Sequence, residues 1–376
     1  MSAHAFLAPS AAHRWVHCPF APTLEAQYPE TEPSPASLEG TAAHEVAGLI
    51  FQGTPPEIGQ QMSNGVAVTQ EMIEGGTLLR DEVWKMLGPE SWPSLKIEQP
   101  IKCSRVHSTL CEGTPDVRGY IHPALIPVWD YKYGFEVVEA FENWQLIAYA
   151  AGVMDELGID GLADQHTVFD LCVVQPRAPH RLGPVRHWKV KASDLRPYVN
   201  RLRNAAEEAA SGKARAVPTP DGCKYCAGRH ACEALQREAF NALAHSQQGA
   251  AFELSPHALG LEARTLIRAQ SLLAARVSGL EAQIEATLRT GGAVPFWVLQ
   301  SEAGRLKWKV PDEQVRAVGQ MFGKDLTTTE VVTPAQAVKA GIPEATVRAF
   351  AERPTSMKLR QDDGTKARLT FSTSVA

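Results

Sequence analysis

The order of apolar patterns in the middle of the chain constrains its fold more than any other feature. Three short strand-like stretches lie close together at residues 95–103, 115–122 and 125–132, and a helical pattern at residues 138–157 follows them. A strongly apolar strand is predicted next, at residues 166–175. Adjacent strands followed by a helix that crosses to another strand favour a mixed sheet over a strictly alternating parallel one. The predicted fold class is therefore α/β, with a mixed central sheet flanked by helices.

Helical spacing also occurs on both sides of this central region. The helices predicted there cover residues 38–51, 69–87, 194–210 and 261–288. A short helix is expected within the first two dozen residues, and a proline-rich linker without regular structure is expected at residues 28–37. A further strand is expected around residues 185–190.

The composition is that of a globular protein. The chain has 376 residues, of which 44% are hydrophobic and 21% charged, which is enough for one large core or two smaller ones. No run approaches the roughly 18 consecutive apolar residues of a membrane-spanning helix. The N-terminus lacks the basic start and apolar run of a secretory signal. We therefore expect a cytoplasmic protein with no membrane partner.

The net charge of −5 is unevenly distributed. Residues 261–376 carry 16 Lys and Arg against 12 Asp and Glu, while the rest of the chain carries 21 against 30. An acidic body can still bind a polyanion if its acids hold metal ions. The charge balance therefore does not exclude a nucleic-acid partner.

Two acids and a lysine lie near strand ends in the segment EGTPDVRGYIHPALIPVWDYKYG. Asp116 begins one predicted strand, and Asp130 and Lys132 end the next. Strand alternation puts Asp130 and Lys132 on one face, and a short hairpin can bring Asp116 alongside. Carboxylates suit hard ions such as Mg²⁺, and a lysine can orient or deprotonate a water. A simple salt bridge of Asp130 with Lys132 or Arg118 also explains that pair.

A cluster of cysteines lies further along the chain. Cys223, Cys226 and Cys232 form the pattern C-x2-C-x5-C, which favours metal binding over packing. Zinc could take His230 as its fourth ligand, whereas an iron–sulfur cluster requires a fourth thiolate, for which Cys18 is a candidate. An odd total of seven cysteines argues against a secreted disulfide framework. The other three are expected to be packing residues: Cys103, Cys111 and Cys172.

The acidic segment resembles the PD-(D/E)XK nuclease superfamily. An acid follows Pro115, and after about a dozen residues comes Asp-x-Lys, followed by Gly134. The run DYKYG is similar to the corresponding motif of the RecB-type branch. The resemblance implies a restriction-endonuclease-like core in which Asp116 and Asp130 hold one or two Mg²⁺ or Mn²⁺ ions and Lys132 is catalytic.

Two further motifs fit the same resemblance. EGTAAHEV resembles the N-terminal helix of RecB-type nucleases, where a histidine contributes to metal binding, and the matching residue is His44. NWQLIAYA resembles their Q-x-x-x-Y motif, which implies that Gln145 and Tyr149, one turn apart, position DNA or the catalytic lysine. Glu98 and Glu112 are candidate accessory acids that match the family pattern less firmly.

The cysteines extend the resemblance to AddB-type and CRISPR-associated RecB-like nucleases. In these, a 4Fe-4S cluster joins the two ends of the catalytic domain. The ligands implied here are Cys18, Cys223, Cys226 and Cys232. Zinc is the less favoured occupant. Closing a loop of about 200 residues would stabilise the fold by several kcal/mol.

The resemblance spans residues 6–235 and looks most like a phage and prophage branch. It implies a metal-dependent DNA nuclease, expected to be an exonuclease, that acts in phage recombination, replication or repair in the cytoplasm of a bacterial host. Its expected partners are DNA and phage recombination or single-strand annealing proteins. The alternative is a non-catalytic DNA-binding or recombination-partner protein that retains the fold.

The predicted domains are a nuclease domain with the cysteine cluster at residues 1–238 and an accessory domain at residues 239–376. In the accessory domain, charged residues flank a tryptophan and are candidate DNA contacts. They are Arg305, Lys307, Trp308 and Lys309. A solvated strand with alternating charges is an equally good explanation of this pattern.

Overall fold

The computed structural model describes residues 5–28, 33–88, 95–120, 125–159, 166–246, 254–299 and 365–372. Two compact units divide the chain: residues 1–286 together with 363–376, and residues 287–362. The sheet and its helices belong to the first unit. The candidate DNA contacts around Trp308 lie outside the described residues, and the boundary predicted near residue 238 stays a prediction. In the ranges given above, no helix is long and apolar enough to cross a membrane.

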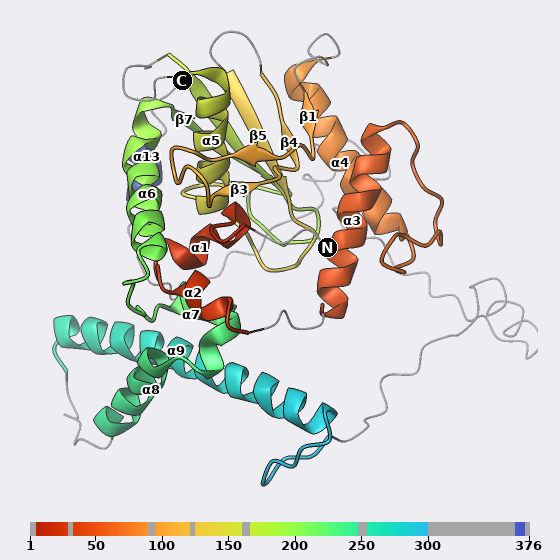
Figure 1. The fold of residues 1–376 in the computed structure, drawn as a ribbon. Coiled ribbons are helices and arrows are strands. Elements are labelled where there is room, and N and C mark those ends of the chain that lie inside the picture. The colour runs from red at the N-terminus through yellow and green to blue at the C-terminus, as the bar shows by residue number, and fades with distance from the viewer. Residues whose placement is uncertain are drawn as a thin grey trace, which may run out of the picture. The chain divides into compact units, whose positions relative to one another are not determined.

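A five-stranded mixed sheet forms the centre of the first unit, as predicted (Figure 1). Its strand order is β1-β4-β5-β6-β7, with β5 and β6 parallel and the other pairs antiparallel. The strands are β1 (Lys96–Ile97), β4 (Val117–Arg118), β5 (Leu125–Tyr131), β6 (Val168–Val174) and β7 (Val185–Lys191). The parallel pair requires a crossover, which α5 (Trp144–Leu157) supplies.

The stretch predicted as one strand at residues 95–103 is broken into two. β1 ends at Ile97, and the chain then turns at Glu98, whose φ of 45° lies in the left-handed region, before Pro100. β2 (Ile101–Lys102) then pairs with β3 (Glu112–Gly113) in a separate two-stranded sheet. The break places Glu98 in a turn instead of a strand.

Helices cover both faces of the large sheet (Figure 1). Along β5, Ile126 and Val128 join the core formed with α5 and α6 (Arg196–Ala210). Trp129 and Tyr131 join a second core, formed with α3 (Pro35–Phe51) and α4 (Gln70–Leu87). This alternation follows from the period of two in a strand, and it leaves the last residues of β5 between the two helical layers.

Capping residues explain two differences in helix boundaries. Ser34 accepts a hydrogen bond from the Ser37 N–H and Pro35 occupies the first turn, so α3 begins inside the predicted linker. The Asn143 side chain accepts from the N–H groups of Gln145 and Leu146, so α5 begins at Trp144 and residues 138–143 are irregular.

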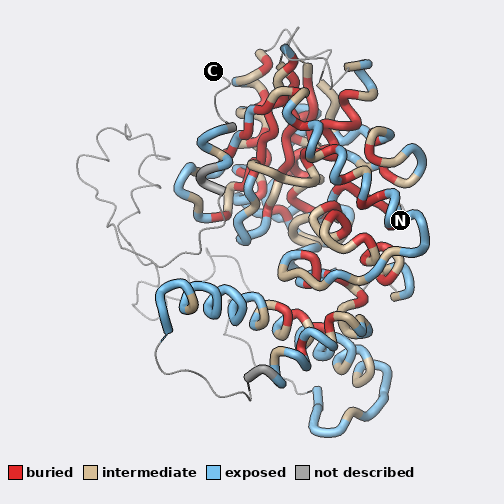
Figure 2. The backbone as a smooth tube through the Cα atoms, turned by 90° about the vertical axis from the view of Figure 1, so that its left-hand side faces the viewer, coloured by how far each residue is buried: buried red, intermediate tan, exposed pale blue. Residues whose placement is uncertain are grey.

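Short elements from distant parts of the chain complete the first unit. The predicted N-terminal helix is a 3-10 turn and two short helices, α1 (Ala12–Trp15) and α2 (Ala21–Glu25), separated at Cys18 and Pro19. The cysteine segment forms α7 (Pro220–Lys224) and a 3-10 turn (Ala227–His230). After these come α8 (Glu233–Ser246) and α9 (Pro256–Arg289), and α13 (Thr365–Ser372) lies near the C-terminus. Most of α9 is exposed (Figure 2).

Candidate active site and cysteine pocket

Asp116 is fixed by two elements that meet at the end of β5. Its Oδ2 accepts a hydrogen bond from the Tyr131 backbone N–H at 2.6 Å. Its Oδ1 lies 3.2 Å from Nδ1 of His44, which α3 carries. The Asp116 backbone carbonyl accepts from the Glu98 N–H at 2.9 Å. The structure therefore brings Asp116 and His44 together, and it ties the turn at Glu98 to the same point.

Asp130 and Lys132 form a second pair beside the first. Nζ of Lys132 donates to Oδ1 of Asp130 at 2.9 Å and to Oε1 of Gln145 at 3.0 Å. Gln145 lies in the first turn of α5, whose N-terminus Asn143 caps. The lysine amine is therefore held between the end of β5 and the N-terminus of α5, the helix that follows it.

Burial and neighbouring charges set the protonation of these four groups. Burial would lower the pKa of His44, but Asp116 outweighs this and raises it. Burial would raise the pKa of Asp116, but His44 and Lys132 lower it overall. Lys132 has a raised pKa because Asp130 and Asp116 outweigh burial, whereas burial raises the pKa of the Asp130 carboxyl. The charged forms of His44 and Lys132 are therefore each favoured by Asp116, and the ionised form of Asp116 is favoured by both of them.

The remaining predicted site residues differ in their placement. Tyr149 is buried in α5, and its hydroxyl donates to the Thr114 carbonyl at 3.1 Å, so it supports the backbone that leads to Asp116. The Glu98 pKa is raised, first by burial and then by Asp116, and its carboxylate lies beside Gly48 of α3, the helix that carries His44. Glu112 lies in the small sheet, in register with Lys102.

The donor set suits a divalent ion. Oδ2 of Asp130 is buried and has no hydrogen-bond partner among the described residues, which is costly unless a cation meets it. Carboxylate oxygens with one imidazole are ligands that Mg²⁺ or Mn²⁺ accepts. Among the residues that the structure describes, no three His, Cys, Asp or Glu side chains lie together at metal-binding spacing. Asp116 and Asp130 instead contact the basic side chains of His44 and Lys132. A metal ion would have to displace these contacts before it could bind the carboxylates.

The segment after Lys132 is held by a residue that the sequence analysis missed. Gln175, which is buried, donates from Nε2 to the carbonyls of Gly134 and Glu136 at 2.8 and 2.7 Å. Its Oε1 accepts from the Val138 N–H at 3.0 Å and from Arg186 at 2.5 Å. The available signal was a glutamine at the end of the apolar strand predicted at residues 166–175, where a buried polar side chain must find partners.

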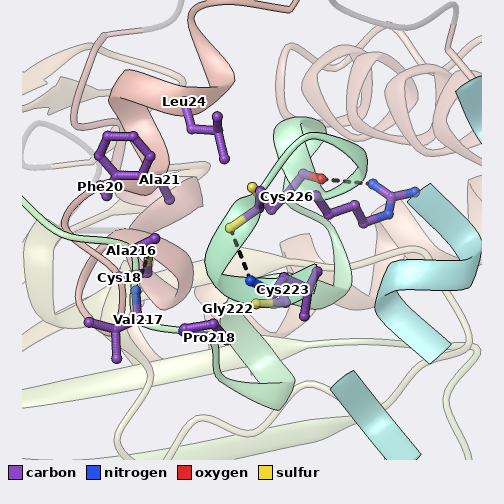
Figure 3. Close-up of a pocket in the computed structure, with 13 residues that line it drawn as sticks. Cys18, Phe20, Ala21, Leu24, Ala216, Val217, Pro218, Gly222, Cys223 and Cys226 are labelled. Atoms are coloured by element: carbon purple, nitrogen blue, oxygen red, sulfur yellow. Dashed lines mark hydrogen bonds between the residues drawn. The ribbon is translucent and has the colours of Figure 1, made fainter. Parts of the chain in front are cut away.

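All four cysteines of the predicted cluster line one pocket. Cys18 reaches it from the N-terminal segment, and Cys223, Cys226 and Cys232 reach it from the segment around α7 (Figure 3). Sγ of Cys18 accepts a hydrogen bond from the Val217 N–H at 3.4 Å, and Sγ of Cys232 accepts from the Leu235 N–H at 3.5 Å. Two segments of the chain that are 199 positions apart therefore meet at these thiols.

The thiols of this pocket influence one another. Burial raises the pKa of Cys223 to about 11 and that of Cys226 to about 12, and neighbouring pocket cysteines add to both shifts. Burial also raises the pKa of Cys18, while backbone hydrogen bonds at Val217, Phe20 and Ala21 lower it. Thiols of this kind bind a metal as thiolates, which the charge of the metal stabilises.

The two candidate occupants of the pocket place different demands on its ligands. A tetrahedral zinc needs all four ligand atoms about 2.3 Å from a single point, whereas an iron–sulfur cluster spreads its cysteine ligands over several iron atoms. His230 does not line the pocket: its ring packs on Tyr28 with centroids 4.4 Å apart, and its Nδ1 lies 3.2 Å from the Ala227 carbonyl oxygen. The other three cysteines are buried elsewhere: Cys103, Cys111 and Cys172.

Two comparisons place the chain among known proteins. A crystal structure from Eubacterium rectale, described as that of a "putative exonuclease", matches with a TM-score of 0.36 and 13% sequence identity. The match covers 66% of this chain and 90% of that one, and a likeness of this size carries no information about activity. The model of the family described as "Protein of unknown function (DUF2800)" matches residues 4–352, and the chain belongs to that family.

Proposed function

We propose that the protein is a divalent-metal-dependent DNA nuclease with a PD-(D/E)XK active site at the end of β5. The observation that carries the proposal is the convergence of two charged pairs, His44 with Asp116 and Lys132 with Asp130, at one end of a mixed sheet. A structural salt bridge needs only one such pair. The buried, unpartnered Oδ2 of Asp130 supplies a further metal donor.

Each residue has a defined task in phosphodiester hydrolysis. Asp116, Asp130 and His44 would hold Mg²⁺ or Mn²⁺, which polarises a phosphodiester and activates water when bound. The Lys132 ammonium would donate to the scissile phosphate and stabilise the charge that develops on it. Gln145 orients that ammonium by accepting a hydrogen bond from it at Oε1.

Tyr149 and Glu98 complete the proposed site in supporting roles. Tyr149 holds the backbone before Asp116 through the Thr114 carbonyl, and so it positions a ligand without touching the substrate. Glu98 is the better placed of the two candidate accessory acids, since Asp116 raises and His44 lowers the pKa of its carboxyl group.

In the same proposal, the cysteine pocket holds a 4Fe-4S cluster that joins the N-terminal segment to α7. The support is the common pocket of the four thiols and the N–H groups of Val217 and Leu235, which donate to two of the sulfurs. Zinc is the competing occupant. Anaerobically purified protein with a cluster should absorb near 400 nm and contain iron, while a zinc protein would be colourless.

The test of the nuclease proposal uses wild-type protein with end-labelled linear DNA and closed circular DNA, each with Mg²⁺, Mn²⁺ or EDTA. We expect metal-dependent loss of linear DNA with circular DNA left intact, the pattern of an exonuclease suited to phage recombination, replication or repair. Cleavage of the circle would make the protein an endonuclease. Stable binding without cleavage in any metal would favour a non-catalytic recombination partner.

A further inference from the structure

An exposed aromatic ring follows the catalytic segment directly. Phe135 lies three residues after Lys132 and is 63% exposed, although large apolar side chains are usually buried. Its neighbour Tyr133 is buried. The chain therefore leaves β5 with one aromatic side chain turned inward and the next turned toward solvent, close to the proposed active site.

This exposed ring is held in place. Gln175 binds the carbonyls on both sides of Phe135, those of Gly134 and Glu136. The Arg177 guanidinium lies 4.0 Å from the Phe135 ring centroid and 4.5 Å from that of Tyr133. One face of Phe135 is thus covered by a cation and the other is free to bind.

Arg177 is itself anchored to both helices on that side of the sheet. It forms ion pairs with Glu39 of α3 at 2.8 Å and with Glu71 of α4 at 3.5 Å. Its side chain is 10% exposed. Because the cation beneath it cannot move freely, the Phe135 ring is ordered before any ligand arrives, which lowers the entropy cost of binding.

A second exposed aromatic ring is clamped to the same segment. Tyr225, which is 54% exposed, donates from its hydroxyl to Oε2 of Glu136 at 2.5 Å. Nζ of Lys224 lies 2.5 Å from Oε1 of the same carboxylate. Glu136, the residue next to Phe135, therefore connects this segment to the C-terminal end of α7. The Lys224 ammonium compensates the negative charge of the Glu136 carboxylate.

We propose that Phe135 and Tyr225 form a stacking platform for the bases of single-stranded nucleic acid entering the site. The inference rests on the proposed nuclease function for its choice of polymer. Aromatic rings stack with any unpaired base, whatever the sequence, whereas the bases of a duplex are already stacked on one another. Phe135 follows Lys132 by three residues, so their Cα atoms lie at most about 11 Å apart, and we expect a strand bound on these rings to pass the proposed active site.

A purely structural role for Phe135 makes a different prediction. Its ring could serve only to shield the ion pairs of Arg177 from water, in which case its loss would alter protein stability without regard to the bases of the ligand. The two roles are separated by a ligand that keeps the phosphates and lacks the bases.

The experiment measures binding of fluorescein-labelled oligo(dT) in EDTA by anisotropy, with an abasic oligonucleotide of equal length as the second ligand. Phe135→Ala should raise the Kd for oligo(dT) about tenfold, since losing one stacked base weakens binding by a factor of about 5 to 150. It should leave the Kd for the abasic strand unchanged. Phe240→Ala is the matched control, because Phe240 is 59% exposed on α8.

Two results would overturn the platform: an unchanged oligo(dT) Kd for Phe135→Ala, or an equal loss on the abasic strand. For the second ring, Tyr225→Ala should weaken oligo(dT) binding more than Tyr225→Phe, which keeps the ring and loses only its hydrogen bond to Glu136. Equal losses for both would exclude Tyr225 from the platform. Since EDTA prevents turnover, these results stand whether or not the wild-type protein cleaves DNA, so the platform and the nuclease proposal fail separately.

Discussion

The acidic site and the cysteine pocket are built in opposite ways. In the acidic site, Asp116, Asp130 and Lys132 lie within a stretch of 17 residues, and strand register with one helix is enough to bring them together. In the pocket, Cys18 comes from the N-terminal segment and meets thiols some 200 positions later, on short turns. Regular secondary structure positions the residues of the first site, whereas the second site forms only when distant segments of the chain come together.

This difference predicts different responses to mutation. The backbone around the acidic site is supported by hydrogen bonds of the sheet and of Gln175, so a side chain can be removed there with the scaffold left in place. The two halves of the pocket are joined by hydrogen bonds from the Val217 N–H to Cys18 and from the Ala227 N–H to Oε1 of Glu25, and a group bound to all four thiols would add a covalent connection. The predictions below start with the largest expected effect on stability.

The largest effect is expected from the cysteine that spans the two halves. Cys18→Ser should lower the iron content and the melting temperature together, with a loss of several kcal/mol, because one ligand of a loop-closing cluster is removed. Iron analysis and thermal unfolding on the same anaerobic sample measure both quantities. The control is Cys103→Ser, which replaces a fully buried thiol outside the pocket, and this variant should keep the wild-type iron content. Full iron content in Cys18→Ser would remove Cys18 from the ligand set.

A smaller loss is expected from the residue that supports the acidic side. Gln175→Leu should reduce the free energy of unfolding by about 3 kcal/mol, since it removes the acceptor of the Val138 N–H, one acceptor of Arg186 and the donor to the Gly134 and Glu136 carbonyls. Urea unfolding measures this change, with the exposed Gln52→Leu as the control. The iron content of Gln175→Leu should stay at the wild-type level, and a parallel loss of iron would mean that the two regions are not independent.

The smallest effect concerns His187, on the far strand of the same sheet. Its Nδ1 lies 3.0 Å from Asp170 and its Nε2 lies 3.4 Å from Glu82, and the hydrogen bond to Asp170 is the main cause of its raised pKa, which Lys189 opposes. A raised folded-state pKa gives stability that is fully present below the unfolded value near 6.5 and is lost as pH rises through the folded one.

His187→Gln should therefore cost about 1 kcal/mol at pH 5.5, and the difference from wild type should shrink by pH 9. Urea unfolding across this range measures it, with the exposed His257→Gln as a control that should show no such trend. A cost that grows with pH would show that His187 is held in its neutral form.

The fold class and the acidic cluster could be predicted from the sequence because both depend on local periodicity. Strand alternation placed Asp130 and Lys132 on one face, where they form an ion pair, and the mixed sheet followed from the order of strands and helices. The turn at Glu98 was missed because the period-two alternation of apolar residues resumes in register after it, at Ile101, although the strand itself ends at Ile97.

Other features depend on contacts that no local pattern contains. Gln175 and Arg177 were not identified, since their roles come from carbonyls and rings brought to them by a different strand end. The clamp between Glu136 and Tyr225 joins residues 89 positions apart. Cys18 was identified from the need of an iron–sulfur cluster for a fourth thiolate and from a family resemblance, because spacing alone does not connect it to the later cysteines.

The central claim is that the charged pairs at the end of β5 perform catalysis, and the most direct test compares Lys132→Ala with Asp130→Asn. Single-turnover cleavage rates and calorimetric Mg²⁺ or Mn²⁺ titration are measured on both. A protonated lysine cannot bind a metal ion, so Lys132→Ala should abolish cleavage with metal affinity and iron content unchanged. Asp130→Asn removes a ligand charge and should weaken metal binding as well as cleavage. Wild-type cleavage by Lys132→Ala would contradict the assignment of this site.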